Sequence, residues 1–257
     1  IAILSQTRVE WWLTDLAILG MGAVTVPIYQ SSTAQDLAFI LNNSKTKILV
    51  LEDKHQYKKW ESIASQCPSV EKVIIIDRQD GVLSWDDFLQ AGRILAGGTK
   101  FEDQLKRAKL DDTASILYTS GTTGLPKGVV LTHRQFVSEL SELFPVLGVS
   151  AADKTLTFLP YAHIVGRVEA LGALHVGYTL AFAESTDRMR SNLKEVQPTA
   201  LIGVPRIFEK IYGSIITQIE AHPVKKKLFK WALSVGKELS NAKRENRTIN
   251  PALMGQY

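Results

Sequence analysis

The sequence predicts a layered α/β fold with a mostly parallel sheet and crossover helices. Short apolar runs alternate along the chain with longer segments of helical periodicity. Strands that are joined through helices in this way form right-handed parallel crossovers. Of the 257 residues, 45% are apolar, which is enough for a well-buried core. No internal repeat or low-complexity segment interrupts the pattern.

The first part of the chain supplies four strands and the helices that follow them. We expect strands at 1–4, 24–28, 47–51 and 73–76. We expect helices at 9–19, 34–41, 54–65, 84–88 and 101–108. Gly20 is placed to end the first helix, and Thr33 is placed to cap the second, with Asp36 in its first turn.

The second part continues the alternation after a strand–loop–strand segment at 114–131. Thr132 and Gln135 have the spacing of a capping box and predict a helix that runs to about Leu143. Further strands are expected at 155–159, 178–183 and 199–203, and further helices at 164–175, 189–196, 206–221 and 224–243.

The strand–loop–strand segment has the composition of a polyphosphate-binding loop. Its centre, residues 118–128, reads YTSGTTGLPKG. Glycines let backbone N–H groups turn toward an anion, hydroxyls add neutral donors, and Lys127 adds a point charge suited to phosphate. It differs from the common P-loop, which ends in Gly-Lys-Ser/Thr and is followed by a helix. The alternative is a ligand-free surface hairpin, which does not require this density of donors.

The same run resembles the signature loop of the adenylate-forming superfamily, which comprises acyl-CoA synthetases, luciferases and peptide-synthetase adenylation domains. Residues 159–168 (LPYAHIVGRV) and 203–211 (GVPRIFEKI) resemble segments of the long-chain fatty acyl-CoA synthetases. The beginning of the chain, through residues 22–29 (GAVTVPIY), resembles the same branch. The likeness extends over essentially the whole chain.

This resemblance implies part of an acyl-CoA synthetase-like N-terminal domain. Residues 1–188 would form the first α/β subdomain, which carries the phosphate loop, and 189–257 would begin the second. The family's later motifs, which bind adenine and ribose and supply a C-terminal catalytic lysine, find no match here. We therefore expect the chain to be the N-terminal portion of a longer enzyme and to be inactive as an isolated fragment.

The activity that the resemblance implies is that of an AMP-forming long-chain fatty acid–CoA ligase using ATP, Mg²⁺ and coenzyme A. Lys127, Thr122 and His163 would be the catalytic residues. The nucleotide phosphates would contact Thr119, Ser120, Gly121, Thr122, Thr123, Gly124 and Lys127. The acid substrate would contact His163, Gly203, Val204 and Pro205. A fatty acyl-AMP ligase, a ligase for shorter or aromatic acids, and a non-catalytic nucleotide- or lipid-binding module are the alternatives.

Several of these residues also have a purely structural interpretation. A histidine at a strand-to-helix junction, such as His163, is commonly a helix cap or a partly buried structural residue. Residues 203–205 equally suit a plain turn between a strand and a helix. Arg167 and Arg206 lie near the motifs, and a salt bridge explains either one. The pair Val165-Gly166 stands where long-chain members often have a Phe-Glu-like pair, which leaves the role of Arg167 open.

The net charge of +4 is unevenly distributed. Residues 222–247 contain eight basic side chains against two acidic ones, with apolar residues between them. Such a helix suits peripheral contact with an anionic membrane surface, or it packs on the rest of a longer protein. No recognition motif accompanies the charge, so we do not expect nucleic acid binding.

The single cysteine, Cys67, excludes an internal disulfide and predicts a reducing compartment. We expect a cytoplasmic protein, with any membrane contact on the cytoplasmic face. The remaining histidines have no metal-ligand spacing, so the sequence predicts no protein-held metal.

Overall fold

The computed structural model describes residues 1–95, 101–119, 124–185, 187–220 and 222–247. Contacts between these residues divide the chain into an N-terminal unit, Ile1–Ile202, and a C-terminal unit, Gly203–Tyr257. Each unit is described by itself. The predicted boundary between residues 188 and 189 separates two subdomains of the longer enzyme, and it stays a prediction.

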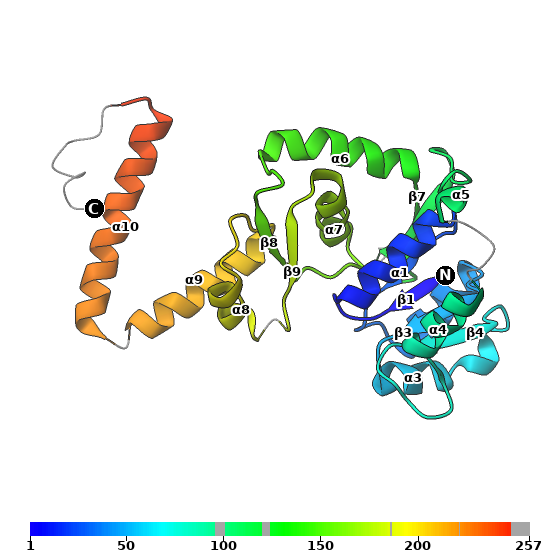
Figure 1. Cartoon of the computed structure of the whole chain (residues 1–257). Coiled ribbons are helices and arrows are strands. Elements are labelled where there is room, and N and C mark those ends of the chain that lie inside the picture. Colours follow the sequence, from blue (N-terminus) through cyan, green and yellow to red (C-terminus); the bar gives the residue numbers. More distant parts are fainter. Residues whose placement is uncertain (96–100, 120–123, 186, 221, 248–257) are drawn as a thin grey trace. The chain divides into compact units, whose positions relative to one another are not determined.

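A parallel five-stranded sheet forms the first half of the N-terminal unit, with the four predicted strands and one further strand, β5 (Figure 1). Its strands are β1 (Ala2–Leu4), β2 (Val26–Ile28), β3 (Ile48–Leu51), β4 (Lys72–Ile75) and β5 (Leu83–Ser84), in the order β2-β1-β3-β4-β5. The helices are α1 (Val9–Gly20), α2 (Ala34–Asn43), α3 (Lys54–Glu61) and α4 (Trp85–Leu95), with a short 3₁₀ turn at Ala64–Gln66. The α2 cap is the predicted one, because the Thr33 hydroxyl accepts from the Asp36 amide (3.1 Å).

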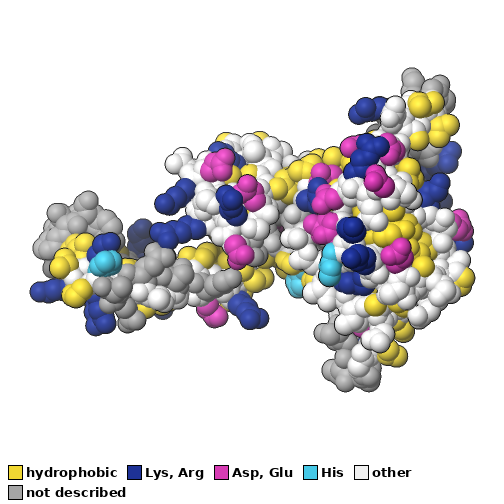
Figure 2. Space-filling model, turned by 90° about the horizontal axis from the view of Figure 1, so that it is seen from below, with side chains coloured by type: hydrophobic (Ala, Val, Ile, Leu, Met, Phe, Trp, Pro, Cys, Tyr) yellow, Lys and Arg dark blue, Asp and Glu magenta, His cyan; other side chains and the backbone are white. Residues whose placement is uncertain are grey.

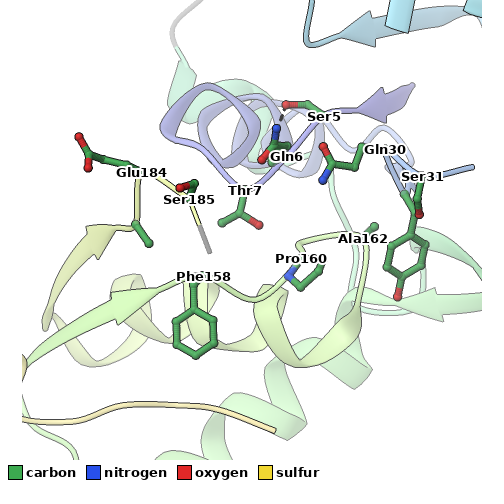
Figure 3. Close-up of a pocket in the computed structure, with 12 residues that line it drawn as sticks. Ser5, Gln6, Thr7, Gln30, Ser31, Phe158, Pro160, Ala162, Glu184 and Ser185 are labelled. Carbon is green, nitrogen blue, oxygen red and sulfur yellow. Dashed lines mark hydrogen bonds between the residues drawn. The ribbon is translucent and has the colours of Figure 1, made fainter. Parts of the chain in front are cut away.

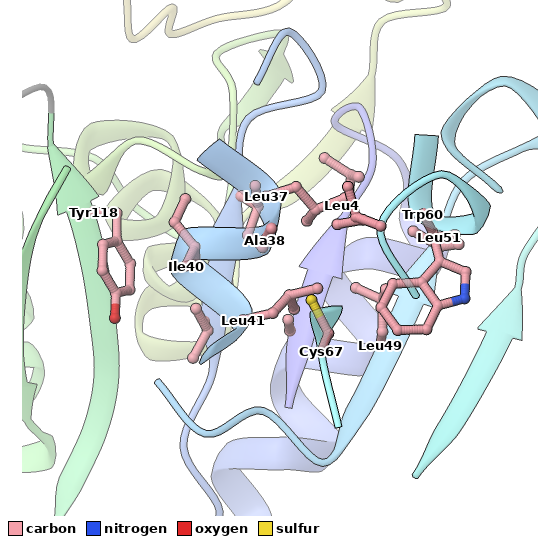
Figure 4. Packing of buried hydrophobic residues seen from close by; sticks show 14 residues of the cluster. Leu4, Leu37, Ala38, Ile40, Leu41, Leu49, Leu51, Trp60, Cys67 and Tyr118 are labelled. Carbon is pink, nitrogen blue, oxygen red and sulfur yellow. The ribbon is translucent and has the colours of Figure 1, made fainter. Parts of the chain in front are cut away.

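The two faces of this sheet bury alternate residues of its central strands. On one face Leu4 and Leu51 pack with α2 and α3, in a cluster that includes Trp60 and the buried thiol of Cys67 (Figure 4). On the other face Ile3 and Val50 pack with Trp11 and Ile18 of α1. Successive side chains of a strand point to opposite faces, so the continuous apolar runs of the sequence are explained by burial on both sides.

An antiparallel hairpin lies next to the edge of this sheet. Its strands are β6 (Thr113–Thr119) and β7 (Lys127–Thr132). A parallel bridge joins Thr25, just before β2, to Ser115 of β6, with the Ile116 amide donating to the Thr25 carbonyl (3.0 Å). The carboxyl end of β6 therefore lies at the same edge as the carboxyl ends of the parallel strands.

The rest of the N-terminal unit is a parallel pair of strands with its helices. The strands are β8 (Lys154–Thr157) and β9 (Thr179–Phe182), and the helices are α5 (Phe101–Leu105), α6 (His133–Leu147), α7 (Ile164–Val176) and α8 (Met189–Val196). Helix α7 is buried from Gly166 through Ala173. It approaches α6 so closely that a β-carbon on Gly172 would overlap the Phe144 ring.

The C-terminal unit contains two helices, α9 (Pro205–Glu220) and α10 (Pro223–Arg244). Along α10 the apolar Val224, Leu228 and Trp231 are exposed among lysines. Figure 2 shows basic and apolar side chains interspersed on this part of the molecule. None of the helices in the described part of the chain has the length and hydropathy that crossing a membrane requires.

Several predicted bounds were wrong. No strand forms at 199–203: an isolated bridge joins Ala200 to Thr155 of β8, and the Lys154 carbonyl accepts from both the Thr199 and Ala200 amides. The helix expected at 54–65 ends at Glu61, and α4 continues past Phe88 to Leu95. At the end of α1, Gly22 rather than Gly20 has the left-handed backbone (φ +69°).

Candidate active site

A cavity of about 230 Å³ opens at the carboxyl ends of the parallel strands. The residues around it directly follow four strands (Figure 3): Ser5–Thr7 after β1, Tyr29–Ser31 after β2, Phe158–Ala162 after β8 and Ala183–Ser185 after β9. Parallel α/β sheets place ligands at this edge. The lining combines hydroxyl and amide groups with apolar side chains, which suits an organic substrate carrying a polar group.

This lining was not among the residues predicted from the sequence. The signal was available, because short polar segments follow three of the strands at their carboxyl ends. The Thr7 hydroxyl also donates to the Leu159 carbonyl (2.7 Å), which ties the end of β1 to the segment after β8. That contact joins residues 152 positions apart, and the sequence gives no direct sign of it.

An adjoining hollow is dominated by ionised groups. The Arg8 guanidinium donates to Glu10 (2.7 Å) and Asp77 (2.8 Å), and these carboxylates raise its pKa. The Gln6 amide donates to Glu52 Oε2 (3.0 Å), while burial raises the pKa of the Glu52 carboxyl. Arg8 is already neutralised by carboxylates, so this hollow is not a ready anion site.

His163 is the N-cap of α7 and immediately follows the cavity residue Ala162. The Val165 amide donates to His163 Nδ1 (3.2 Å), so the structure assigns the helix-cap role that the sequence left open. A nitrogen that accepts carries no proton, and the remaining proton of the neutral ring is then on Nε2. The exposed imidazole therefore presents an N–H donor to the solvent side of the site.

The two ends of the predicted phosphate loop face each other across the hairpin. Thr119 is paired with Lys127, and both side chains are exposed. Beside them Gly128 makes room for Tyr118, because a β-carbon there would lie 3.2 Å from the tyrosine ring. Tyr118 packs beside Ile40 of α2, and its hydroxyl donates to Asn43 Oδ1 (2.6 Å) (Figure 4). The base of the loop is thus held against the five-stranded sheet.

The structure places only some of the predicted site residues. Thr119, Gly124 and Lys127 are at the hairpin, and Gly124 has a positive φ of 91° that glycine tolerates. Ser120, Gly121, Thr122 and Thr123 lie outside the described residues. Gly203, Val204 and Pro205 begin the C-terminal unit, where Pro205 is the first residue of α9.

Beneath the site lies a buried polar cluster centred on Arg167. Its Nε and Nη2 donate to the two carboxylate oxygens of Asp15 (3.0 and 2.7 Å), and its Nη1 donates to Ser115 Oγ (2.6 Å). The guanidinium also lies 4.9 Å from the ring centre of Phe136. Both members of the ion pair are fully buried, with side-chain exposures of 0% and 1%. The salt bridge that the sequence offered for Arg167 is therefore present.

Two residues further along α7, Glu169 is buried without an ion-pair partner among the described residues. Its Oε2 accepts from the Thr157 hydroxyl (2.9 Å), and its Oε1 has no hydrogen-bond partner in the described part of the chain. Burial raises the pKa of Glu169 to about 7, against the weaker opposing effect of the Thr157 hydrogen bond.

The chain is similar to several long-chain-fatty-acid–CoA ligases. It is 32% identical to the long-chain-fatty-acid–CoA ligase FadD15 of Mycobacterium bovis, over 94% of this chain and 40% of that protein. It is 30% identical to the long-chain-fatty-acid–CoA ligase ACSBG2 of Homo sapiens, over 98% of this chain and 39% of that protein. The chain thus spans about 40% of the length of these relatives.

The fold is also similar to that of a solved protein domain. The inhibitor-bound N-terminal domain of FACL13 from Mycobacterium tuberculosis matches with a TM-score of 0.69 and 25% identity, covering 81% of this chain and 50% of that one. The family model described as AMP-binding enzyme matches residues 1–250. Since that match includes both units apart from the last residues, the chain belongs to the AMP-binding enzyme family.

Proposed function

We propose that this chain is the N-terminal part of an AMP-forming long-chain fatty acid–CoA ligase. The observation that carries the proposal is the hairpin with Thr119 and Lys127 paired at its loop end. It lies at the carboxyl edge of the sheet, along which the polar cavity also opens. The names of the two relatives support the acid and thiol substrates.

In the first step a carboxylate oxygen of the fatty acid attacks the α-phosphorus of ATP. The bond from that phosphorus to the bridging oxygen of the β-phosphate breaks, and pyrophosphate leaves. The thiolate of coenzyme A then attacks the acyl carbon of the acyl-adenylate, and AMP leaves with the electrons of the acyl–oxygen bond. Positioning and charge stabilisation carry both steps.

The roles of the residues follow from that charge movement. Lys127 and Thr119, with the loop residues Ser120, Gly121, Thr122, Thr123 and Gly124, would hold the phosphates where negative charge builds up on the leaving group. The Nε2–H of His163 would donate to the acid's carboxylate and orient it. Gly203, Val204 and Pro205 would line the substrate pocket from the start of α9.

Mg²⁺ belongs to the proposal only as an ion that enters with the ATP phosphates. In the described part of the chain, no three acidic, histidine or cysteine side chains gather as a metal site. No step above depends on a protein-held ion.

The cellular setting is a further part of the proposal. We place the protein in the cytoplasm, with α10 contacting the anionic cytoplasmic face of a membrane. The lysines beside the exposed Leu228 and Trp231 support this, since basic and apolar side chains together bind anionic bilayers. Co-sedimentation of the full-length protein with anionic and with neutral vesicles tests it, and equal recovery with both would contradict it.

The test of the activity is acid-dependent exchange of pyrophosphate into ATP by the full-length protein. Octanoate, hexadecanoate and an aromatic acid are offered in parallel. We expect hexadecanoate to support the fastest exchange. A different preferred acid would keep adenylation and overturn the substrate, and no exchange with any acid would favour a non-catalytic binding module.

Lys127→Ala tests the phosphate loop directly. We expect exchange to fall about 10²- to 10³-fold, the scale for one lost donor to a developing oxyanion, and the same for Thr122→Ala. Lys47→Ala is the matched control, because this exposed lysine precedes β3 at the opposite edge of the sheet and pairs with Glu71. An unchanged exchange rate in both loop variants would refute the proposal that the loop binds the ATP phosphates.

A further inference from the structure

Arg167 joins the two parts of the proposed active site. Four positions before it on the chain is His163, whose carbonyl accepts from the Arg167 amide (3.3 Å) at the first turn of α7. Through Nη1 the same residue reaches Ser115 on β6, four positions before Thr119 at the start of the phosphate loop. A single side chain thus connects the helix that carries His163 with the strand that leads into the loop.

The connection is made at both ends by well-directed contacts. Ser115 Oγ donates to the Thr25 carbonyl (2.8 Å), and the Thr25 hydroxyl donates to Asp15 Oδ1 (2.7 Å), which closes a ring of hydrogen bonds around the guanidinium. The Arg167 guanidinium also lies over the rings of Trp11 and Phe136, at 5.8 and 4.9 Å from their centres. A planar guanidinium group held by these contacts has little freedom to change its orientation.

The first turn of α7 is also fixed from its other side. A β-carbon on Gly166 would lie 2.8 Å from the Pro160 carbonyl oxygen, so the helix backbone is already in contact with the segment before it. The His163 amide donates to that same oxygen (2.9 Å). The Arg167–Ser115 hydrogen bond is therefore a direct polar link from this fixed turn to β6, beside the apolar packing of Ala114 with Leu171.

We propose that Arg167 is a positioning residue, and the inference rests on the proposed function. It sets the distance between the acid, which His163 orients, and the ATP phosphates, which the loop holds. Attack of a carboxylate on phosphorus depends strongly on this distance, since a misplacement of about 1 Å lowers a rate about 10²-fold. Stability alone does not require an arginine here, because well-packed apolar residues often replace a buried ion pair without loss.

Ser115→Ala is the variant that tests the link, because it removes the contact to β6 and leaves the Asp15 ion pair in place. Its control is Ser84→Ala, which also deletes a buried serine hydroxyl. Ser84 lies on β5, the edge strand farthest from β6, and its hydroxyl donates to Asp87 Oδ2 (2.6 Å). Exchange kinetics and the thermal midpoint of each full-length variant are measured with hexadecanoate.

We expect both variants to lose similar thermal stability, whereas only Ser115→Ala lowers kcat, by about 10-fold, with KM values for ATP and acid within about twofold. Arg167→Lys keeps the charge and should lower kcat further. Equal kcat for Ser115→Ala and Ser84→Ala, relative to active wild type, overturns the inference. If the wild type itself shows no exchange, the proposed function is refuted, and this inference, which rests on it, is refuted as well.

A double-mutant cycle with His163→Ala tests the stated route. If Ser115 acts by placing the loop relative to the acid that His163 holds, Ser115→Ala should lower kcat by less than about threefold once His163 is gone. A repeated 10-fold loss in that background would mean that the two residues act independently and would overturn the role of Arg167 in connecting them.

Discussion

Two arginine–aspartate pairs in the N-terminal unit have nearly the same geometry and opposite surroundings. Arg167 binds both carboxylate oxygens of Asp15 at 3.0 and 2.7 Å, and Arg134 binds both oxygens of Asp111 at 2.7 and 2.9 Å. The first pair has side-chain exposures of 0% and 1%, and the second 57% and 78%. Water and salt screen only the exposed pair. Removal of one partner should therefore lower the free energy of unfolding much more at the buried pair than at the exposed pair.

Glu169 shows what happens when a buried charge lacks such a partner. It lies two residues from Arg167 on the same helix and is equally buried. Arg167 has Asp15 as a counter-charge, whereas the Glu169 carboxyl has one hydroxyl donor and a pKa raised to about 7 by burial. A buried carboxyl can thus avoid its charge by taking up a proton, whereas an arginine cannot.

The largest expected effect comes from breaking the buried pair. Asp15→Ala leaves the Arg167 guanidinium buried without a counter-charge, which should lower the free energy of unfolding by about 3–5 kcal/mol. Urea unfolding of the full-length protein measures this change. The double variant Asp15→Leu, Arg167→Met should recover much of the stability, because it removes both charges. A single variant as stable as the wild type would show that Arg167 finds another partner.

A smaller effect is expected from Glu169→Gln, and it should depend on pH. The folded-state pKa of about 7 lies above the ordinary glutamate pKa of 4.5, so between these values the folded state binds more protons than the unfolded state. Wild-type stability should therefore fall as pH rises from about 4.5 to about 7, by roughly 3 kcal/mol in total.

The glutamine cannot ionise, so the difference in stability between variant and wild type should grow in the variant's favour over that range and stay constant above it. Paired urea titrations at several pH values measure the difference. A constant difference from pH 4 to 8 would mean that Glu169 has an ordinary pKa.

The smallest effect is expected from Asp111→Ala at the exposed pair. Although the pair is bidentate, both side chains are exposed to solvent. We therefore expect the free energy of unfolding of the variant at physiological salt to equal that of the wild type within error. The Arg134 guanidinium lowers the pKa of Asp111, so any contribution should appear at low salt and disappear as the carboxyl is protonated in acid. A loss comparable to that of Asp15→Ala would refute the role of burial in the comparison.

Local signals predicted most of the N-terminal unit. The caps at Thr33 and Thr132 gave the starts of α2 and α6, and α8 has the predicted bounds. Strand β5 was not predicted, because its two residues, Leu83 and Ser84, are too few for a periodic pattern. The fold class could be predicted because apolar runs buried on both faces differ in composition from the helices between them.

The candidate site could be predicted only in part. The donors around Lys127 are contiguous in sequence, so the composition of the segment was sufficient to suggest a phosphate loop. The partner of Arg167 is 152 positions away, and a lone arginine beside a motif does not indicate whether it faces solvent or an aspartate. The cavity was missed for the same reason, because its lining comes from four strand ends that are adjacent only after folding.

The buried thiol in the Leu4–Leu51 cluster has a practical consequence. Cys67 is the single cysteine of this sequence, it is 1% exposed, and burial raises the pKa of its thiol. A reagent that requires the thiolate should therefore modify it only when the packing of α2 and α3 on the sheet opens. Its labelling rate would report how often this face opens, and a second cysteine placed on the surface could carry a fluorophore without competition from the first.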